Sequence, residues 1–221
     1  YFIGTNDSVH SVILQPDGKI VFGGLFTTYK NEPTNRIARS HNGTFDSSFI
    51  TGSGFNTAVN TLVLQPNGKI VVGGNFTTYK GVTANRLVRL NGDGQFYETF
   101  DTDDGFDSTV WVLALQPDGK IMVGGDFTNY KGETATNFVR LNSDGTRDDT
   151  FHAGNGFNDN TVRAIALQPD GKILVGGGFT EYKGTEANRI VRLHGDLIVN
   201  WADGESGSKT INLPIVDDLL V

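Results

Sequence analysis

Residues Leu14 to Lys30 read LQPDGKIVFGGLFTTYK, and the chain repeats this stretch three more times with few changes. The further copies begin at Leu64, Leu115 and Leu167, which gives spacings of 50, 51 and 52 residues. A repeat of this length, built from strand-like units, is typical of a β-propeller or a solenoid. The four copies therefore decide the fold, and the rest of the chain connects or follows them.

Each copy predicts four antiparallel strands. Residues Gln15 to Gly18 form a turn, because proline presets φ at the second position and glycine accepts a positive φ at the last. Apolar runs flank the turn at Ser11 to Leu14 and Ile20 to Phe22. A third strand follows at Asn35 to Arg39, and a short fourth strand lies around Phe49. We therefore predict an all-β fold, a β-propeller of four four-stranded blades of about 50 residues, with the first strand of each blade innermost.

Two recurring features predict how the blades pack. A pair of glycines interrupts the second strand, where glycine normally weakens pairing unless another backbone approaches closely. We expect crowding between neighbouring blades to supply that approach. A Phe and a Tyr follow each pair and offer large apolar area to fill the wedge between blades. These positions are Gly23-Gly24, Phe26 and Tyr29; Gly73-Gly74, Phe76 and Tyr79; Gly124-Gly125, Phe127 and Tyr130; and Gly176-Gly177, Phe179 and Tyr182.

Composition and charge exclude several classes of protein. The chain has 221 residues, enough for one all-β domain with a substantial core. Its net charge of −7 disfavours non-specific attraction to nucleic acid or to an anionic membrane. No apolar run reaches the roughly 20 residues needed to span a bilayer. With no cysteine, the chain has no disulfide or thiolate chemistry. We expect no nucleic-acid partner and no membrane span.

Both ends of the chain depart from the repeat. Tyr1 to Ile3 matches the residues that precede the second copy, so the chain opens within what the other copies use as a fourth strand. Either this strand closes the ring against the fourth repeat, or the chain is a piece of a longer protein. After Leu193 the repeat stops, and alternation predicts a hairpin with strands at Leu197 to Trp201 and Lys209 to Ile215. The expected domains are the propeller at 1–195, with copies starting near 9, 59, 110 and 162, and a β-hairpin tail at 196–221.

The repeated motif resembles a known family. The pattern LQPDGKI-x-x-GG-x-FT-x-YKG, followed by NR-x-x-RLN and an SDGT-like turn, is similar to the delta-60 repeat over residues 2–193. The diglycine with a downstream aromatic is also similar to kelch repeats, but the QPDGK turn favours the first family. Delta-60 repeats occur in large bacterial surface and secreted proteins and are expected to form β-propellers. The resemblance implies an extracellular or cell-surface location.

The C-terminal residues resemble a second family. The stretch NWADGESGSKTINLPIVDD, Asn200 to Asp218, is similar to the closing hairpin of a Calx-beta domain, a calcium-binding sandwich. That resemblance implies that Asp217 and Asp218 belong to a calcium site. The opening strands of such a domain are absent, so we expect calcium to bind only when the rest of the sandwich is supplied. We expect no other cofactor.

A second group of acidic residues is a candidate calcium site. Asp101, Asp103, Asp104 and Asp107 form the densest acidic run, and calcium prefers six to eight oxygen ligands. However, the matching positions in the earlier linkers are not acidic, and the D-x-D-x-D-G spacing of a calcium loop is never completed. The sequence therefore favours a solvated loop over a cation site.

The candidate ligand-binding residues vary between copies at one equivalent position. Directly after the valine that starts the first strand, the copies carry His10, Asn60, Trp111 and Arg163. A propeller brings equivalent positions to one rim of its channel, where these groups are suited to stacking on and hydrogen-bonding a polar or sugar-like ligand. The competing interpretation is ordinary variation at an exposed strand end. A second variable position holds Leu25, Asn75, Asp126 and Gly178, and these side chains suggest no shared role.

Enzyme signatures such as H-E-x-x-H and G-x-S-x-G are absent from the sequence, and the four histidines do not cluster. We therefore predict a non-enzymatic structural or interaction module, for example in adhesion, whose partners are other proteins or surface glycans. The alternative is a propeller that binds a carbohydrate or small ligand at the channel rim. Exposed strand edges also allow self-assembly, and we expect the tail to pair with such an edge.

Overall fold

The computed structural model describes residues 4–97, 99–100, 104–151, 156–158 and 161–194. Every regular element in these ranges is a β-strand. The described residues contain no helix with the length and apolar character to cross a membrane. The expected C-terminal hairpin with Asp217 and Asp218 lies outside the described residues, as do Tyr1 to Ile3, Asp101 and Asp103.

The first repeat forms a four-stranded antiparallel sheet. Its strands, from one side to the other, are β1 (Val9–Leu14), β2 (Ile20–Gly24), β5 (Ile37–His41) and β6 (Thr44–Phe45). A small hairpin of β3 (Thr28–Tyr29) and β4 (Glu32–Pro33) extends between β2 and β5. The fourth strand therefore lies just before Phe49, which is itself a buried residue outside the sheet.

The other repeats build a sheet with the same three main strands, and the outer strand is shorter in the second and third repeats. In the second and third repeats the fourth strand is reduced to one bridge each, Leu90 with Phe96 and Leu141 with Arg147. The three main strands of the second to fourth repeats are β7 (Val59–Leu64), β8 (Ile70–Gly74) and β11 (Leu87–Leu90); β12 (Val110–Leu115), β13 (Ile121–Gly125) and β16 (Phe138–Leu141); and β17 (Val162–Leu167), β18 (Ile173–Gly177) and β21 (Ile190–Leu193). Their small hairpins are β9 (Thr78–Tyr79) with β10 (Val82–Thr83), β14 (Asn129–Tyr130) with β15 (Glu133–Thr134), and β19 (Glu181–Tyr182) with β20 (Thr185–Glu186).

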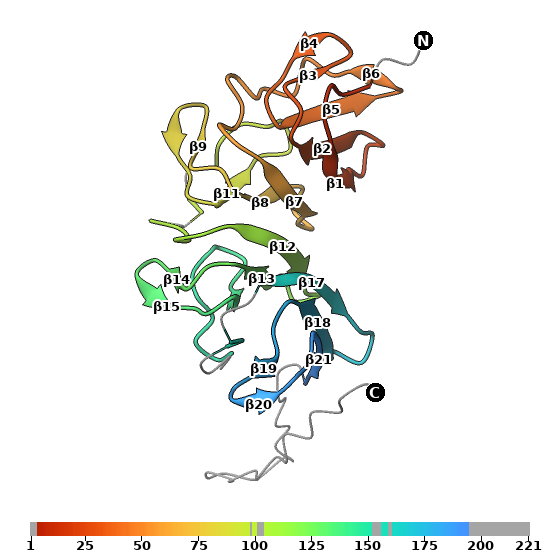
Figure 1. Ribbon diagram of the computed structural model, residues 1–221. Helices are drawn as coiled ribbons and strands as arrows, with labels where there is room; N and C mark the ends of the chain where they lie inside the picture. Colours follow the sequence, from red (N-terminus) through yellow and green to blue (C-terminus); the bar gives the residue numbers. More distant parts are fainter. Residues whose placement is uncertain (1–3, 98, 101–103, 152–155, 159–160, 195–221) are drawn as a thin grey trace.

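The four sheets fan out like the blades of a propeller, as the repeat predicts. The first strands of consecutive repeats lie against one another, β1 on β7, β7 on β12 and β12 on β17. In Figure 1 these strands run along the middle of the molecule, and the small hairpins lie toward its outside. The prediction that the first strand of each blade is innermost is therefore confirmed.

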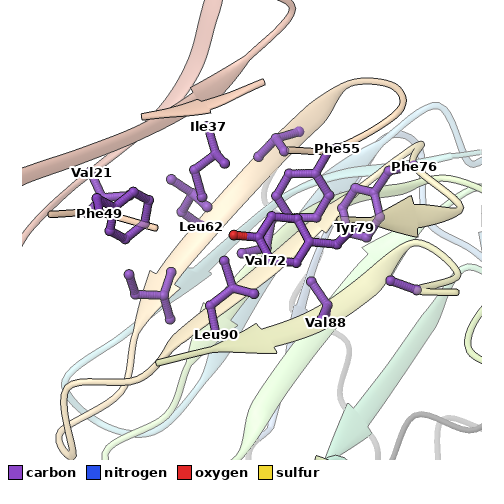
Figure 2. Close-up of a cluster of buried hydrophobic side chains, with 13 residues drawn as sticks. Val21, Ile37, Phe49, Phe55, Leu62, Val72, Phe76, Tyr79, Val88 and Leu90 are labelled. Atoms are coloured by element: carbon purple, nitrogen blue, oxygen red, sulfur yellow. The ribbon is translucent and has the colours of Figure 1, made fainter. Parts of the chain in front are cut away.

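Three of the four hydrophobic cores among the described residues lie between two blades each, and the fourth, with Phe26 and Tyr29, lies on the first blade alone. Figure 2 shows the first of them, in which Val21 and Ile37 of the first blade meet Leu62 and Val72 of the second. Phe76 and Tyr79 complete this core, and both rings pack on Phe55 from the linker, with ring centroids 4.3 and 4.4 Å apart. The next two cores repeat the arrangement one and two blades further along. The aromatic residues thus fill the wedges between blades, as expected.

In the first three repeats the two glycines of the pair are required for different reasons. A Cβ added to the first glycine would meet the valine that starts the first strand of the next blade, which we call the leading valine of that blade. At Gly23, such a Cβ would lie only 2.3 Å from Val59 Cγ1. A Cβ on the second glycine would instead meet backbone of its own blade, at 2.0 Å from the Ser8 carbonyl oxygen in the case of Gly24. Crowding between blades is therefore confirmed for the first glycine only.

The Gln-Pro-Asp-Gly turns adopt the predicted geometry. The amide of Gly18 donates a hydrogen bond to the Gln15 carbonyl at 3.0 Å, which closes the turn. The glycines at the end of the four turns have positive φ, as the turn chemistry requires: Gly18 at 81°, Gly68 at 79°, Gly119 at 87° and Gly171 at 81°.

The substitution Gly124→Ala should destabilise the fold by about 1–3 kcal/mol, because overpacking a tight contact costs that much. Its Cβ would lie 2.4 Å from Val162 Cγ1 and 2.8 Å from Val112 Cγ1. Gly176→Ala is the matched control, since the nearest atoms to its Cβ are 3.7 Å away. Denaturant titration at protein concentrations low enough to keep the chain monomeric should leave the control within about 0.5 kcal/mol of the parent. Equal losses for the two variants would contradict the proposed packing.

Candidate functional site

The four predicted rim residues are all β-bulge residues. The pairing of the first and second strands shifts register around each of them, so each stands unpaired between two ladder positions: His10, Asn60, Trp111 and Arg163. A bulge re-aims its side chain and leaves the ladder on either side intact. This geometry explains why the position tolerates an imidazole, an amide, an indole and a guanidinium in otherwise similar blades.

Two of the four predicted residues contact each other. The guanidinium carbon of Arg163 lies 4.8 Å from the centroid of the Trp111 ring, a cation–π contact between the third and fourth blades. The indole Nε1–H of Trp111 donates a 2.7 Å hydrogen bond to Oδ2 of Asp126. Thr161 donates its hydroxyl to the other oxygen of the same carboxylate. We call Trp111, Asp126, Thr161 and Arg163 the rim cluster.

The other two predicted residues behave differently. Asn60 is buried, and its Nδ2 donates a 3.0 Å hydrogen bond to the carbonyl of Val110 in the next blade. That contact joins the second blade to the third and turns the amide away from solvent. His10 is exposed on the first blade. The structure therefore brings Trp111 and Arg163 together, and ligand binding by all four residues stays a prediction.

Two of the four residues at the second variable position, Asn75 and Asp126, share a role that sequence reasoning missed. Asp126 accepts the hydroxyl of Thr161, and Asn75 Oδ1 accepts a 3.0 Å hydrogen bond from the hydroxyl of Thr109. In both cases the residue after the diglycine of one blade holds the threonine that precedes the leading valine of the next. The two positions change together in the sequence, which could have predicted this contact. Asn75 and Asp126 are each followed by a threonine before the next leading valine, whereas apolar Leu25 is followed there by Ala58.

Buried arginines tie neighbouring blades together away from the rim. Arg39 Nη1 donates a 2.7 Å hydrogen bond to the Gly92 carbonyl of the second repeat, and Gln15 Nε2 donates to the same oxygen at 3.0 Å. Asp46 balances the charge, with its Oδ2 2.8 Å from Arg39 Nε. The repeated NR-x-x-RL motif therefore has a structural use, since its second arginine bridges repeats.

The equivalent arginine of the third blade forms a buried ion pair. Arg140 Nε lies 2.6 Å from Asp148 Oδ2, and Lys120 Nζ lies 3.0 Å from the same oxygen. Burial raises the pKa of Asp148, but hydrogen bonds from Thr150, Lys120 and Arg140 outweigh it and hold the pKa far below the usual range. This carboxylate therefore stays charged at neutral pH and pairs with Arg140 and Lys120 inside the blade.

Asp107, the last residue of the acidic run near the third repeat, caps a small hairpin. Asp107 Oδ1 accepts backbone N–H bonds from Thr128 and Asn129 at 2.9 and 3.0 Å. Partial burial raises the pKa of Asp107, but its hydrogen bonds with Thr128 and Asn129 outweigh it and lower the pKa to about 2. Among the described residues no three His, Cys, Asp or Glu side chains group as metal ligands.

Family comparison identifies the repeats. The family model described as "Domain of unknown function (DUF5122) beta-propeller" matches residues 15–49, 65–100, 116–151 and 168–197. No curated protein matches the chain.

Solved structures with low sequence identity also align with the chain. One is the extracellular domain of a putative one-component system from B. thetaiotaomicron, with a TM-score of 0.43, 12% identity and coverage of 86% of this chain and 24% of that one. Another is the WD40 β-propeller domain of Doa1, with a TM-score of 0.41, 14% identity and coverage of 79% of this chain and 64% of that one. The chain thus spans less than two thirds of either structure.

Acid should weaken the cap at Asp107. Because its folded pKa lies below the ordinary value of 3.8, the carboxylate stabilises the fold above about pH 4. That contribution is lost as the pH falls toward about 2. Between about pH 4 and pH 2, the melting temperature of the Asp107→Asn variant should fall less than that of the parent chain, because an amide does not titrate. The side chain is exposed, so screening keeps the difference below about 1 kcal/mol.

The second repeat supplies the control for this measurement. Asn56 caps the equivalent hairpin, and its Oδ1 accepts backbone N–H bonds from Thr77 and Thr78 at 2.9 and 3.1 Å. Asn56→Asp should therefore add acid sensitivity where Asp107→Asn removes it. Identical pH profiles for the parent and both variants would contradict the capping role.

Proposed function

The chain belongs to the DUF5122 β-propeller family, and on that premise we propose that it is a structural and interaction module without catalytic activity. We place it in a bacterial cell-surface or secreted protein, with other proteins or surface glycans as its partners. The resemblance of residues 2–193 to delta-60 repeats supports this location, because such repeats occur in large surface and secreted proteins. The three interfaces between neighbouring blades use six of the eight faces of the described blades, which leaves two outer faces for partners.

One observation carries the proposal, an apolar face on the first blade. Val12 is 60% exposed and Leu14 66% exposed, whereas the residues equivalent to Val12, Leu62 and Leu113, are 5% and 6% exposed. The exposed side chains come from β1 and lie next to Ile20 of β2, which is also exposed. A contiguous apolar surface on a folded domain is typical of a protein interaction site.

The use of the charged residues also supports a non-catalytic role. The partly buried carboxylate of Asp46 is paired with Arg39 and the buried carboxylate of Asp148 with Arg140, which stabilises the blades. Asp126 is engaged by Trp111 and Thr161. These groups are held in place by neighbours in the fold, whereas a general acid or base needs access to a substrate proton.

The rim cluster supports a second candidate function, binding of a carbohydrate or other polar ligand at the channel rim. Trp111 offers an aromatic face, and the exposed guanidinium of Arg163 offers donors in a fixed fork. Asp126 fixes the orientation of the indole. A ligand would compete with Arg163 for the face of Trp111, so this function is the weaker of the two.

The resemblance of the C-terminal residues to a Calx-beta hairpin supports one further role. We propose that Asp217 and Asp218 contribute to a calcium site when the remaining strands of such a sandwich are supplied. Both residues lie outside the described residues.

The exposed face should bind the hydrophobic dye ANS, which reports accessible apolar surface. The measurement uses a dilution series of the chain, because any partner that covers the face, a second copy included, would exclude the dye. The double variant Val12→Thr with Leu14→Thr should reduce the fluorescence several-fold, since threonine suits a strand but removes apolar area. Val82→Thr, at an exposed position in β10, is the matched control. A parent chain that binds no dye at any dilution would contradict the proposed interaction face.

A further inference from the structure

The three interfaces inside the molecule share one design. The leading valine of each incoming blade sits over the first glycine of the preceding blade. The distance from valine Cγ1 to an ideal Cβ on that glycine is 2.3 Å for Val59 and Gly23, 2.6 Å for Val110 and Gly73, and 2.4 Å for Val162 and Gly124. Each of these valines is fully buried. A valine and a bare glycine are therefore the two halves of one contact.

The outgoing face of the fourth blade has the glycine half of this contact without the valine. A Cβ added to Gly176 would find its nearest atoms 3.7 Å away, in contrast to the three crowded glycines before it. Ile190, on the neighbouring strand β21, is 42% exposed. Its equivalents are buried under the next blade: Ile37, Leu87 and Phe138.

The incoming face of the first blade has the valine half without the glycine. Val9 pairs with Gly24 in the same register as Val59 with Gly74, so it is the leading valine of its blade. Its side chain is 41% exposed, whereas the other three leading valines are 0% exposed. Val12, Leu14 and Ile20 extend this face and are also exposed. The two open faces thus match each other residue for residue.

We propose that a second copy of this chain covers both faces. This rests on the proposed interaction function and names its partner. The first blade of each copy packs on the fourth blade of the other, with Val9 of one copy over Gly176 of its partner. Both contacts are then identical under a two-fold axis. Two sets of four blades make a ring of eight, which lies within the usual range of four to eight for propellers.

Each contact joins two different faces, so the angle between the two copies decides whether they close into a ring. The same face pairing at a different angle would add copies without end and form filaments. The internal interfaces decide between these outcomes, because they already curve the four blades around the first strands (Figure 1). A fourth interface of the same design continues that curvature into the second copy.

Sedimentation equilibrium on the 221-residue chain tests the ring. The expected mass is twice the 23.9 kDa of one chain. Gly176→Ala should raise the dissociation constant at least about tenfold, because its Cβ would collide with Val9 of the partner copy. The same variant should keep the melting temperature of a dissociated parent chain, since no described residue of its own chain crowds this position. Val12→Asp should also dissociate the ring, because it places a charge on the first-blade face of the contact. Val82→Asp, at an exposed position in β10 outside this face, should not.

The outcomes separate this proposal from the function on which it rests. A parent chain that stays monomeric at every concentration overturns the ring. If that monomer still binds ANS through Val12 and Leu14, the interaction face stands and its partner is another protein. A dimer that is unaffected by Gly176→Ala, or an assembly of any other size, also overturns the ring.

Discussion

The contact between a valine and a bare glycine sets the distance between neighbouring blades. A single added methyl group at Gly23, Gly73 or Gly124 would overlap the next blade, so the sheets approach closely only because these positions have no side chain. That approach lets the apolar faces of two blades share one core. Apart from the small core of the first blade, the cores of the described residues are shared between two blades, and stability therefore resides largely in the interfaces between neighbours, as in other repeat proteins.

Polar groups reinforce the same interfaces. Arg39 and Gln15 reach one carbonyl of the next repeat, while Asn75 and Asp126 hold the threonines that precede the leading valines. The bulge residues differ in what they contact. Asn60 also joins two blades through the carbonyl of Val110, whereas Trp111 and Arg163 stack on each other.

The regular features of this fold could be predicted from the sequence because they depend on short stretches. The period, the turns ending at Gly18 and its equivalents, and the strand order all follow from local patterns. The link from Asp126 to Thr161 joins two blades, so the packing between blades decides it. The bulges and the ion pair of Arg140 with Asp148 depend on strand register and burial within a blade, which no short sequence pattern shows. Local sequence also gave no sign that Lys30 and its equivalents would adopt a positive φ.

A double-mutant cycle on Gly23 and Val59 tests the central contact most directly. Gly23→Ala alone should destabilise the chain by about 1–3 kcal/mol, because the new methyl group meets Val59 Cγ1. Val59→Ala removes that atom, so in its presence Gly23→Ala should cost much less. We expect a coupling free energy of at least about 1 kcal/mol between the two substitutions. Additive losses of stability would contradict an architecture built on this contact.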